Sequence, residues 1–236
     1  MWIIYPQIIN IFDGDYKRYF LYKTVLSYSK NMEKYVLDTN LFFNMEPGIG
    51  LGKKTEEVVV KATEAMKKLK SAGKAEFFMP PRIVDEFLSF FEDKEQPFLK
   101  SFLAEISVKS PDLQKAQFPA EAFYKIVEDI RGRSYRGLII AEEELKKTAD
   151  QLMGTAKLQG KDYEIKVGQF IKTLRDRYRQ ATRFGFLDSV ADLDIIALAK
   201  ELGAYLVSTD EGVIAWGRIF GVKEVSAQVF GQKLQG

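Results

Sequence analysis

Two runs of apolar residues, each followed by an aspartate, constrain the fold of this 236-residue chain more than any other feature. The first run, Tyr-Val-Leu, ends at Asp38. The second, Ala-Tyr-Leu-Val, is followed by Ser-Thr and then Asp210. Apolar residues without alternation are typical of parallel strands that are covered on both faces. The sequence therefore predicts an α/β fold with a parallel sheet flanked by helices.

The other segments predict one α/β domain with a helical insertion. Helices are expected at 55–72, 81–91, 97–106, 119–153, 163–183, 188–202 and 211–217, and further strands at 75–79 and 222–225. Gly154 and Gly160 bracket a turn, so the two long helices within 119–183 are expected to form an inserted, protruding αα-hairpin. Residues 1–31 are expected to be an N-terminal extension, either from a start codon upstream of the true one or as a real element that packs on the domain. Residues 32–226 form the predicted α/β domain, and 227–236 a C-terminal tail.

The composition limits the chemistry that is available. The chain has neither Cys nor His, which excludes disulfides, thiolate metal sites and a histidine base. Hydrolysis would then depend on carboxylates, Lys, Tyr, hydroxyl groups or a hard cation. No stretch of about 20 apolar residues occurs, so we expect no membrane span, and the lack of Cys is typical of the reducing cytoplasm. The net charge is only +2, so any surface for nucleic acid must be local.

Acidic residues occur at three places that this fold would bring together. Asp38 and Asp210 follow strands, and open α/β sheets bind their ligands at that edge. Asp188 and Asp192 lie four residues apart at the start of a helix, so they share one face. Four converging carboxylates repel one another at low dielectric unless a cation lies between them. The sequence therefore predicts a site for Mg²⁺ or Mn²⁺, which prefer oxygen ligands.

Each of these acids also has a structural explanation. An Asp after a strand can form an Asx-turn or cap the next helix, and Asp188 or Ser189 can cap the helix that follows. The order of the acids along the chain favours the metal site over separate caps. Glu86 is a further candidate, next to Asp85, and at most one of the two can face the site. Asp194 falls opposite the Asp192 side of the helix and is expected to be a solvated neighbour.

Four basic residues form a stripe along the second long helix. Lys172, Arg175, Arg179 and Arg183 are spaced by 3, 4 and 4 residues, which places them on one helix face. Arginine binds phosphate with two parallel hydrogen bonds, so the stripe favours an RNA backbone as its partner. The alternative is a solvated face that pairs with the acids at 142–144 of the partner helix.

Three segments resemble PIN-domain nucleases. They are 35–40 (Tyr-Val-Leu-Asp-Thr-Asn), 80–87 (Pro-Pro-Arg-Ile-Val-Asp-Glu-Phe), and the block from Asp192 to Asp210 with its apolar pair, Ala-x-Ala, Gly and apolar strand. The resemblance covers about 34–110 and 184–226, and it implies a PIN-like sheet with a metal-dependent nuclease site.

Within that superfamily, residues 171–189 and the helices before them resemble the minimal protein-only RNase P group, which has also been described as RNA ligase partner proteins. The resemblance implies removal of the 5′ leader of precursor tRNA by a large homo-oligomer held partly by the protruding helices. It also implies catalytic acids at Asp38, Asp188, Asp192 and Asp210, and arginines that contact tRNA at Arg175 and Arg179.

Three other functions are compatible with parts of the pattern. A PIN-type ribonuclease could cut an RNA other than precursor tRNA. A non-catalytic RNA-binding partner of an RNA ligase would use the acids only as helix caps. A receiver-like signalling domain also clusters Asp around Mg²⁺, but Lys223 is a poor match for the lysine that such a domain places after a late strand.

Overall fold

The computed structural model describes residues 32–44, 48–154, 157–183, 187 and 189–236. Its centre is a five-stranded parallel sheet in the order β3-β2-β1-β4-β5. The strands are β1 (Glu33–Leu37), β2 (Ala75–Met79), β3 (Ile106–Val108), β4 (Tyr205–Val207) and β5 (Lys223–Glu224). The chain leaves β1 for one edge of the sheet and later returns to β4 on the other side of β1. The direction of the strand order therefore reverses between β1 and β4.

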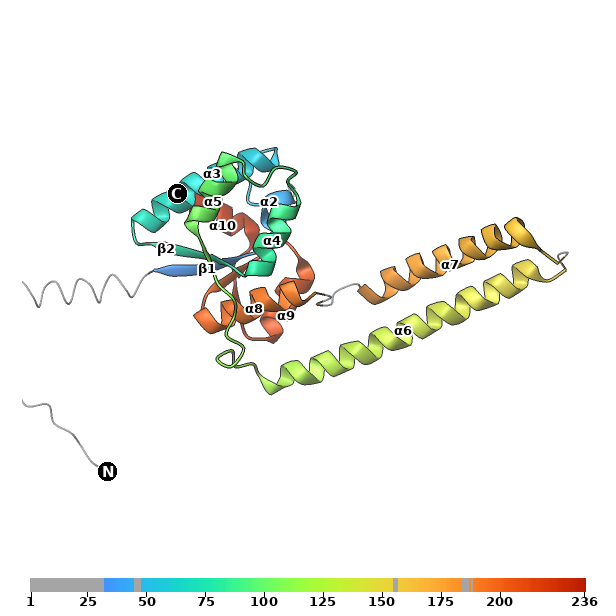
Figure 1. Cartoon of the computed structure of the whole chain (residues 1–236). Helices are drawn as coiled ribbons and strands as arrows, with labels where there is room; N and C mark the ends of the chain where they lie inside the picture. Colours follow the sequence, from blue (N-terminus) through green and yellow to red (C-terminus); the bar gives the residue numbers. More distant parts are fainter. Residues whose placement is uncertain (1–31, 45–47, 155–156, 184–186, 188) are drawn as a thin grey trace, which may run out of the picture.

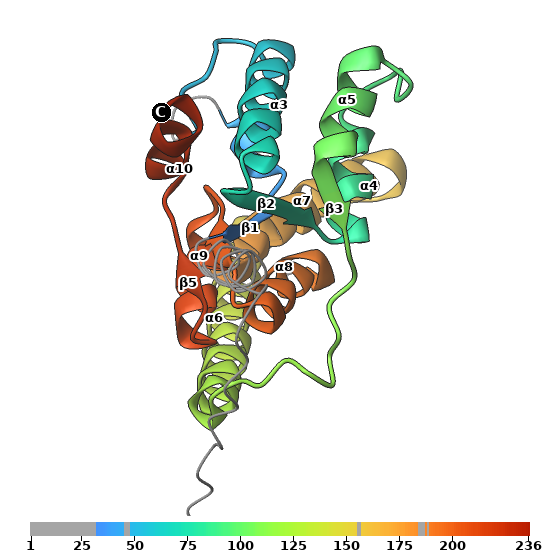
Figure 2. The same ribbon diagram turned by 90° about the vertical axis from the view of Figure 1, so that its left-hand side faces the viewer.

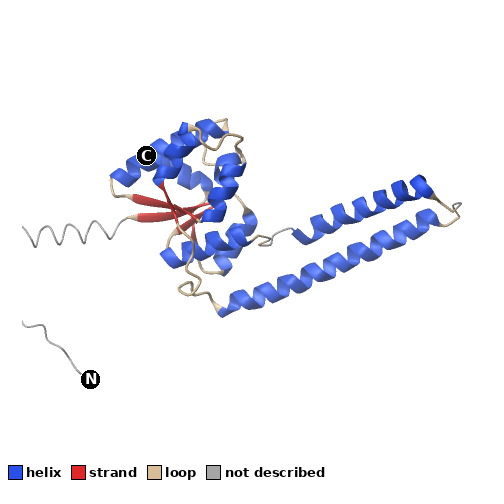
Figure 3. Ribbon diagram, viewed as in Figure 1, coloured by secondary structure: helices blue, strands red, loops and turns tan. Residues whose placement is uncertain are grey.

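Helices cover both faces of this sheet (Figures 1, 2 and 3). One face carries α3 (Thr55–Ser71), α5 (Pro97–Glu105) and α10 (Ala227–Gln235), and the other carries α8 (Val190–Leu202) and α9 (Glu211–Ile219). Two short helices, α2 (Asn40–Phe43) and α4 (Pro81–Ser89), follow β1 and β2 directly, and α4 packs against α8. The predicted α/β architecture with a flanked parallel sheet is confirmed.

The apolar runs form the buried centre of the sheet, because strands without polar alternation are covered on both faces. Val36 and Leu37 of β1 and Val207 of β4 have no exposed surface. Helix α8 buries the continuous run Ile195–Ala199, which fits a helix that lies against the sheet on one side and against α4 and α9 on others. Both faces of the central strands are therefore dry, and polar side chains are left for the ends of the strands.

The two long helices are α6 (Ala120–Leu152) and α7 (Gly160–Arg183), here called the helical arm. They pack on each other and extend away from the sheet (Figure 1). A Cβ atom on Gly137 would lie 2.6 Å from Cε2 of Tyr178, so the absence of a side chain lets α6 and α7 approach closely there. Gly154 and Gly160 have positive φ angles of 75° and 54°, which glycine adopts without strain.

Two segments differ from the sequence-based expectation. The helix expected to reach Ile106 stops at Glu105, and Ile106–Val108 instead forms strand β3, which pairs with β2. The segment expected to be a tail, 227–236, forms α10 and buries Phe230 and Leu234. The N-terminal extension at 1–31 lies outside the described residues. Within the described part of the chain, no helix is long and apolar enough to cross a membrane.

Candidate active site at the carboxyl edge of the sheet

The point where the strand order reverses has an aspartate on each side. Asp38 directly follows β1, and its backbone N–H donates to the carbonyl of Val207 in β4 at 3.0 Å. Asp210 follows β4 after two further residues. Open α/β sheets bind their ligands in the crevice outside such a reversal point. The sheet therefore brings these two aspartates to the same edge.

Asp38 is a buried carboxyl group with only 3% of its surface exposed. The Ser208 hydroxyl donates a short hydrogen bond to Asp38 Oδ2, and the Asn40 side-chain amide donates to the same oxygen at 3.4 Å. Burial, together with the negative charges of Asp192 and Glu86, raises the pKa of Asp38 to about 6, although the hydrogen bond from Ser208 lowers it. Asp38 is therefore a carboxylate held in a position where its charge is unfavourable.

Asp192 and Glu86 come from two helices that pack on each other beside Asp38. Asp192 is the third residue of α8, whose N-cap is Ser189; the Ser189 hydroxyl accepts from the Asp192 backbone N–H at 3.0 Å. Partial burial and then the charge of Asp192 raise the pKa of Glu86. Glu86, rather than the preceding Asp85, is therefore the acid of α4 whose field reaches Asp38 and Asp192. The acids beside Asp38 therefore come from α4 as well as from α8.

Asp210 is the N-cap of α9. Its Oδ1 accepts from the backbone N–H groups of Gly212 at 2.7 Å and Val213 at 3.1 Å. Its own N–H donates to the Ser208 hydroxyl at 2.9 Å, so that one hydroxyl connects the Asp210 backbone with the Asp38 carboxylate. The capping role therefore uses one oxygen of Asp210 and leaves Oδ2 outside these bonds. Ser208 was not identified from the sequence, where its only signal is a hydroxyl residue two positions before an Asp.

The donor set at this edge has the chemistry of a hard-cation site, since all of its acidic groups are oxygen ligands. A cation would also favour the ionised form of Asp38, which burial and the charges of Asp192 and Glu86 disfavour. Among the described residues, however, no three acidic side chains form a group ready to hold a metal ion. Asp188, the fourth predicted acid, lies outside those residues. The predicted ligand set of Asp38, Asp188, Asp192 and Asp210 therefore stays a prediction.

Asp194 has a partner on α4. Arg82 Nη1 lies 2.6 Å from Asp194 Oδ2, and the Asp194 side chain is 13% exposed while that of Arg82 is 60% exposed. Asp194 thus joins α8 to α4 in an ion pair, instead of being the solvated neighbour expected from the sequence. The pair ties together the two helices that carry Glu86 and Asp192.

The basic stripe of the helical arm is exposed. Lys172, Arg175 and Arg179 are all exposed on α7, and within the described part of the chain none of them has an acidic partner. The side chain of Arg183 lies outside what the structure describes. These three residues therefore do not form the ion pairs with the acids of α6 that the sequence left open as the alternative.

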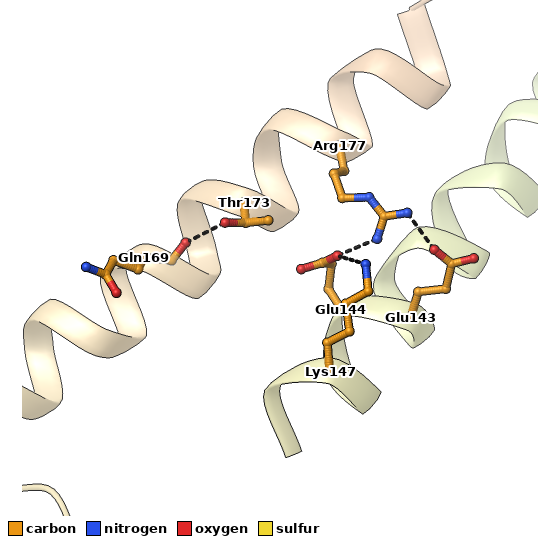
Figure 4. A network of polar contacts seen from close by, with 6 residues as sticks. All are labelled: Glu143, Glu144, Lys147, Gln169, Thr173 and Arg177. Atoms are coloured by element: carbon orange, nitrogen blue, oxygen red, sulfur yellow. Dashed lines mark hydrogen bonds and ion pairs between the residues drawn. The ribbon is translucent and has the colours of Figure 1, made fainter. Parts of the chain in front are cut away.

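The acids of α6 bind a different arginine. Arg177 donates from Nη2 to Glu143 Oε2 at 2.5 Å and from Nη1 to Glu144 Oε1, which also lies 3.3 Å from Lys147 Nζ (Figure 4). Arg177 is off the stripe and faces α6, where the Glu144 side chain is only 8% exposed. The network thus uses one arginine to join the helices and leaves the exposed stripe open to a ligand.

Comparison with known proteins identifies the family. The family model of the PINc domain ribonuclease matches residues 34–236. This chain belongs to that ribonuclease family. Among its relatives is the RNA-free ribonuclease P of Thermococcus kodakarensis, which is 34% identical over 86% of this chain and 94% of the relative. The proteins of the same name from Thermodesulfovibrio yellowstonii and Alkalilimnicola ehrlichii are 32% and 33% identical, over 87% and 86% of this chain and 95% and 97% of their own lengths.

Proposed function

We propose that this protein is a metal-dependent endoribonuclease that removes the 5′ leader of precursor tRNA. One observation carries the proposal: Asp38 and Asp210 follow the two strands between which the strand order reverses, and the Ser208 hydroxyl connects the Asp38 carboxylate to the Asp210 backbone. The names of the relatives support precursor tRNA as the substrate.

Asp38, Asp192 and Asp210 would hold one or two Mg²⁺ or Mn²⁺ ions, with Asp188 as a further ligand or as the group that orients the attacking water. When bound, such an ion would lower the pKa of a water molecule and neutralise charge that develops on the phosphate. Ser208 fixes the Asp38 carboxylate by its hydrogen bond. Water then attacks the phosphorus and the bond to the 3′ oxygen of the leader breaks, which leaves a 5′-phosphate on the tRNA and a 3′-hydroxyl on the leader.

The basic stripe of α7 would hold the folded body of the tRNA. Lys172, Arg175, Arg179 and Arg183 present charges that suit phosphate groups, and structured RNA is recognised mainly through its shape and backbone. Such binding does not need base-specific contacts. It would position the leader over the carboxylate cluster.

A cleavage assay tests the catalytic proposal. A 5′-labelled precursor tRNA is incubated with the protein with and without Mg²⁺, and the 5′ ends of the products are mapped. We expect one cut at the mature 5′ end, only with the cation, and a loss of about 10²–10³-fold in Asp192→Asn, as for other groups that stabilise transition-state charge. The control is Asp85→Asn, an exposed acid on α4. Cuts in other RNAs but not in precursor tRNA would instead indicate a different PIN-type activity, and no cleavage with retained RNA binding would indicate a non-catalytic partner of a ligase.

Binding of mature tRNA at several salt concentrations tests the stripe separately. Replacing Arg175 and Arg179 by Gln removes two phosphate contacts, so the slope of log K against log salt should decrease by about 2. The matched control is the double Gln variant of Lys67 and Lys68, exposed on α3. An equal loss in both double variants would contradict a specific role for the stripe.

We also propose that the protein is a cytoplasmic homo-oligomer that assembles through the helical arm. Large apolar side chains are exposed along both arm helices, a pattern that marks interaction surfaces. They include Phe123, Tyr124, Val127, Ile130, Tyr135, Leu138, Leu145, Tyr163 and Ile165. Light scattering of the wild type and of Leu138→Glu/Leu145→Glu tests this, and a monomeric wild type would refute it.

A further inference from the structure

A cluster of phenylalanines lies beside the carboxylate site, and one ring of this cluster is exposed. The rings contact one another at centroid separations between 4.2 and 5.8 Å. Most are buried or half-buried, but Phe90 is 56% exposed. The cluster comprises Phe42, Phe43, Phe87, Phe90, Phe91, Phe98 and Phe102.

Phe90 lies against one other ring. Its centroid is 4.2 Å from that of Phe43, with 31° between the ring planes. Among the described residues, Phe43 is the only aromatic side chain that contacts Phe90. Phe43 in turn packs on Phe87 and Phe91, at 5.7 and 5.8 Å. Phe90 is thus supported from one side by a fixed ring, while more than half of its own surface meets solvent.

Phe43 and Phe90 belong to the ends of two short helices, α2 and α4, which lie side by side in Figure 1 and which also follow or carry the acids. Phe90 comes four residues after Glu86 at the end of α4, so the two side chains lie one turn apart on the same side of the helix. Phe43 is the last residue of α2, which begins two residues after Asp38. The exposed ring therefore borders the carboxylate cluster, within reach of a nucleotide next to one held there.

We propose that Phe90, backed by Phe43, is a stacking platform for an unpaired nucleobase of the leader, next to the phosphate that is cut. This inference rests on the proposed function. Bases of unpaired RNA stack on exposed aromatic rings, and such stacking tolerates any sequence because every base has a π face. A paired base of the acceptor stem is already stacked, so the leader strand is the part of the substrate that this ring can engage.

The ring chemistry and its setting both favour a base over a protein partner. The exposed residue is one aromatic ring supported by another, which suits a flat ligand such as a nucleobase. The phosphate next to that base would lie at the acids through the cation of the proposed function. The exposed apolar side chains of the helical arm are numerous and extend over a long surface, as expected for protein contacts, whereas Phe90 is a single exposed ring of its cluster. The same argument therefore separates two surfaces on one chain.

The test uses precursor tRNA with 2-aminopurine at the last leader nucleotide, in EDTA so that no cleavage occurs. Stacking quenches the fluorescence of this base, so we expect quenching by the wild type and by Phe90→Trp, and loss of quenching in Phe90→Ala and Phe90→Leu. Phe90→Ala should also bind the precursor about tenfold more weakly, with unchanged affinity for mature tRNA. The control is Leu113→Ala, which truncates another exposed apolar side chain (69% exposed) outside the arm.

Several outcomes would overturn the platform. They are quenching that persists in Phe90→Ala, a Phe90→Leu variant equal to the wild type, or an equal loss of affinity for mature tRNA. A Phe90 variant whose melting temperature falls is replaced by Phe90→Tyr, which must retain quenching. If the wild type quenches the label but never cuts precursor tRNA when Mg²⁺ is added, the platform stands and the proposed function fails. If it cuts at the mature 5′ end without quenching, the platform fails alone.

Discussion

Replacing Asp38 by Asn should stabilise the metal-free protein, because the ionised carboxylate is held where its charge is unfavourable. The pKa of Asp38 is about 6 in the folded protein, compared with a reference value of 3.8. A difference of about 2 pKa units corresponds to about 3 kcal/mol at 1.36 kcal/mol per unit. The folded state holds the proton more tightly than the unfolded state, so ionisation of Asp38 destabilises the fold. The contribution of Asp38 to the free energy of unfolding is therefore most favourable below pH 3.8, where the group is protonated in both states. This contribution is lost as the pH rises through 6.

This sign sets the design of the measurement. Unfolding by urea is followed for the wild type and Asp38→Asn in EDTA at pH 5 and pH 8. Asn keeps the shape of the side chain and an oxygen that accepts from Ser208, but it does not ionise. The advantage of Asp38→Asn should approach about 3 kcal/mol at pH 8 and should be about half as large at pH 5. Asp85→Asn, which changes an exposed acid, should show no such dependence.

Adding Mn²⁺ extends the same experiment. A cation that binds only the folded state raises its stability by an amount that grows with the ratio of free ion to dissociation constant. The wild type should therefore gain stability and Asp38→Asn should gain much less. An Asp38→Asn protein that is less stable than the wild type in EDTA at pH 8, or whose advantage does not change between pH 5 and pH 8, would refute the electrostatic argument.

Two further predictions concern the helical arm, and hydrogen exchange of α6 and α7 amides measures both. Gly137→Ala places a Cβ atom 2.6 Å from the Tyr178 ring, so it should loosen the arm by roughly 1–3 kcal/mol, whereas Gly132→Ala, whose Cβ would meet only the end of Arg136 at 3.4 Å, should be neutral or stabilising. Arg177→Gln should also speed exchange in both arm helices, because it removes the ion pairs that join Arg177 of α7 to Glu143 and Glu144 of α6. The amides of the central sheet strands should stay protected. Faster exchange in Gly132→Ala than in Gly137→Ala, or unchanged exchange in Arg177→Gln, would contradict this account.

Much of the fold follows from local sequence signals. The strands β1 and β4 and the helix α8 each contain a continuous apolar run with clear ends, and the burial of these runs depends on little beyond their own composition. The strand β3 (Ile106–Val108) has only three residues, too few to show a period, and it extends a segment with helical spacing. Its structure comes from pairing with β2, which the local sequence does not specify. The helix α10 likewise depends on tertiary contact, since Phe230 packs on Tyr35 at 5.1 Å.

The candidate site divides in the same way. That Asp38 and Asp210 share one edge follows from the two strands and the rule for parallel sheets. The choice of Glu86 over Asp85, and the link through Ser208, depend on distances between separate elements that one sequence cannot supply. The same holds for the arm: the spacing defines the stripe, but only the contact between α6 and α7 shows that Arg177 is the arginine that takes the acids.

A chain with a net charge of +2 can act on RNA because its charges are separated rather than in excess. Carboxylates lie at the edge of the sheet, while exposed positive charge lies on α7. The acids of α6 do not neutralise this charge, because they form their ion pairs with Arg177. A polyanion is attracted to the arm and repelled by the sheet edge, so a cation at the acids would strengthen the approach of the RNA to them. The unfavourable charge of Asp38 and the exposed basic stripe therefore act together. The phosphate backbone first binds to the stripe beside the site and is then cut at the acids.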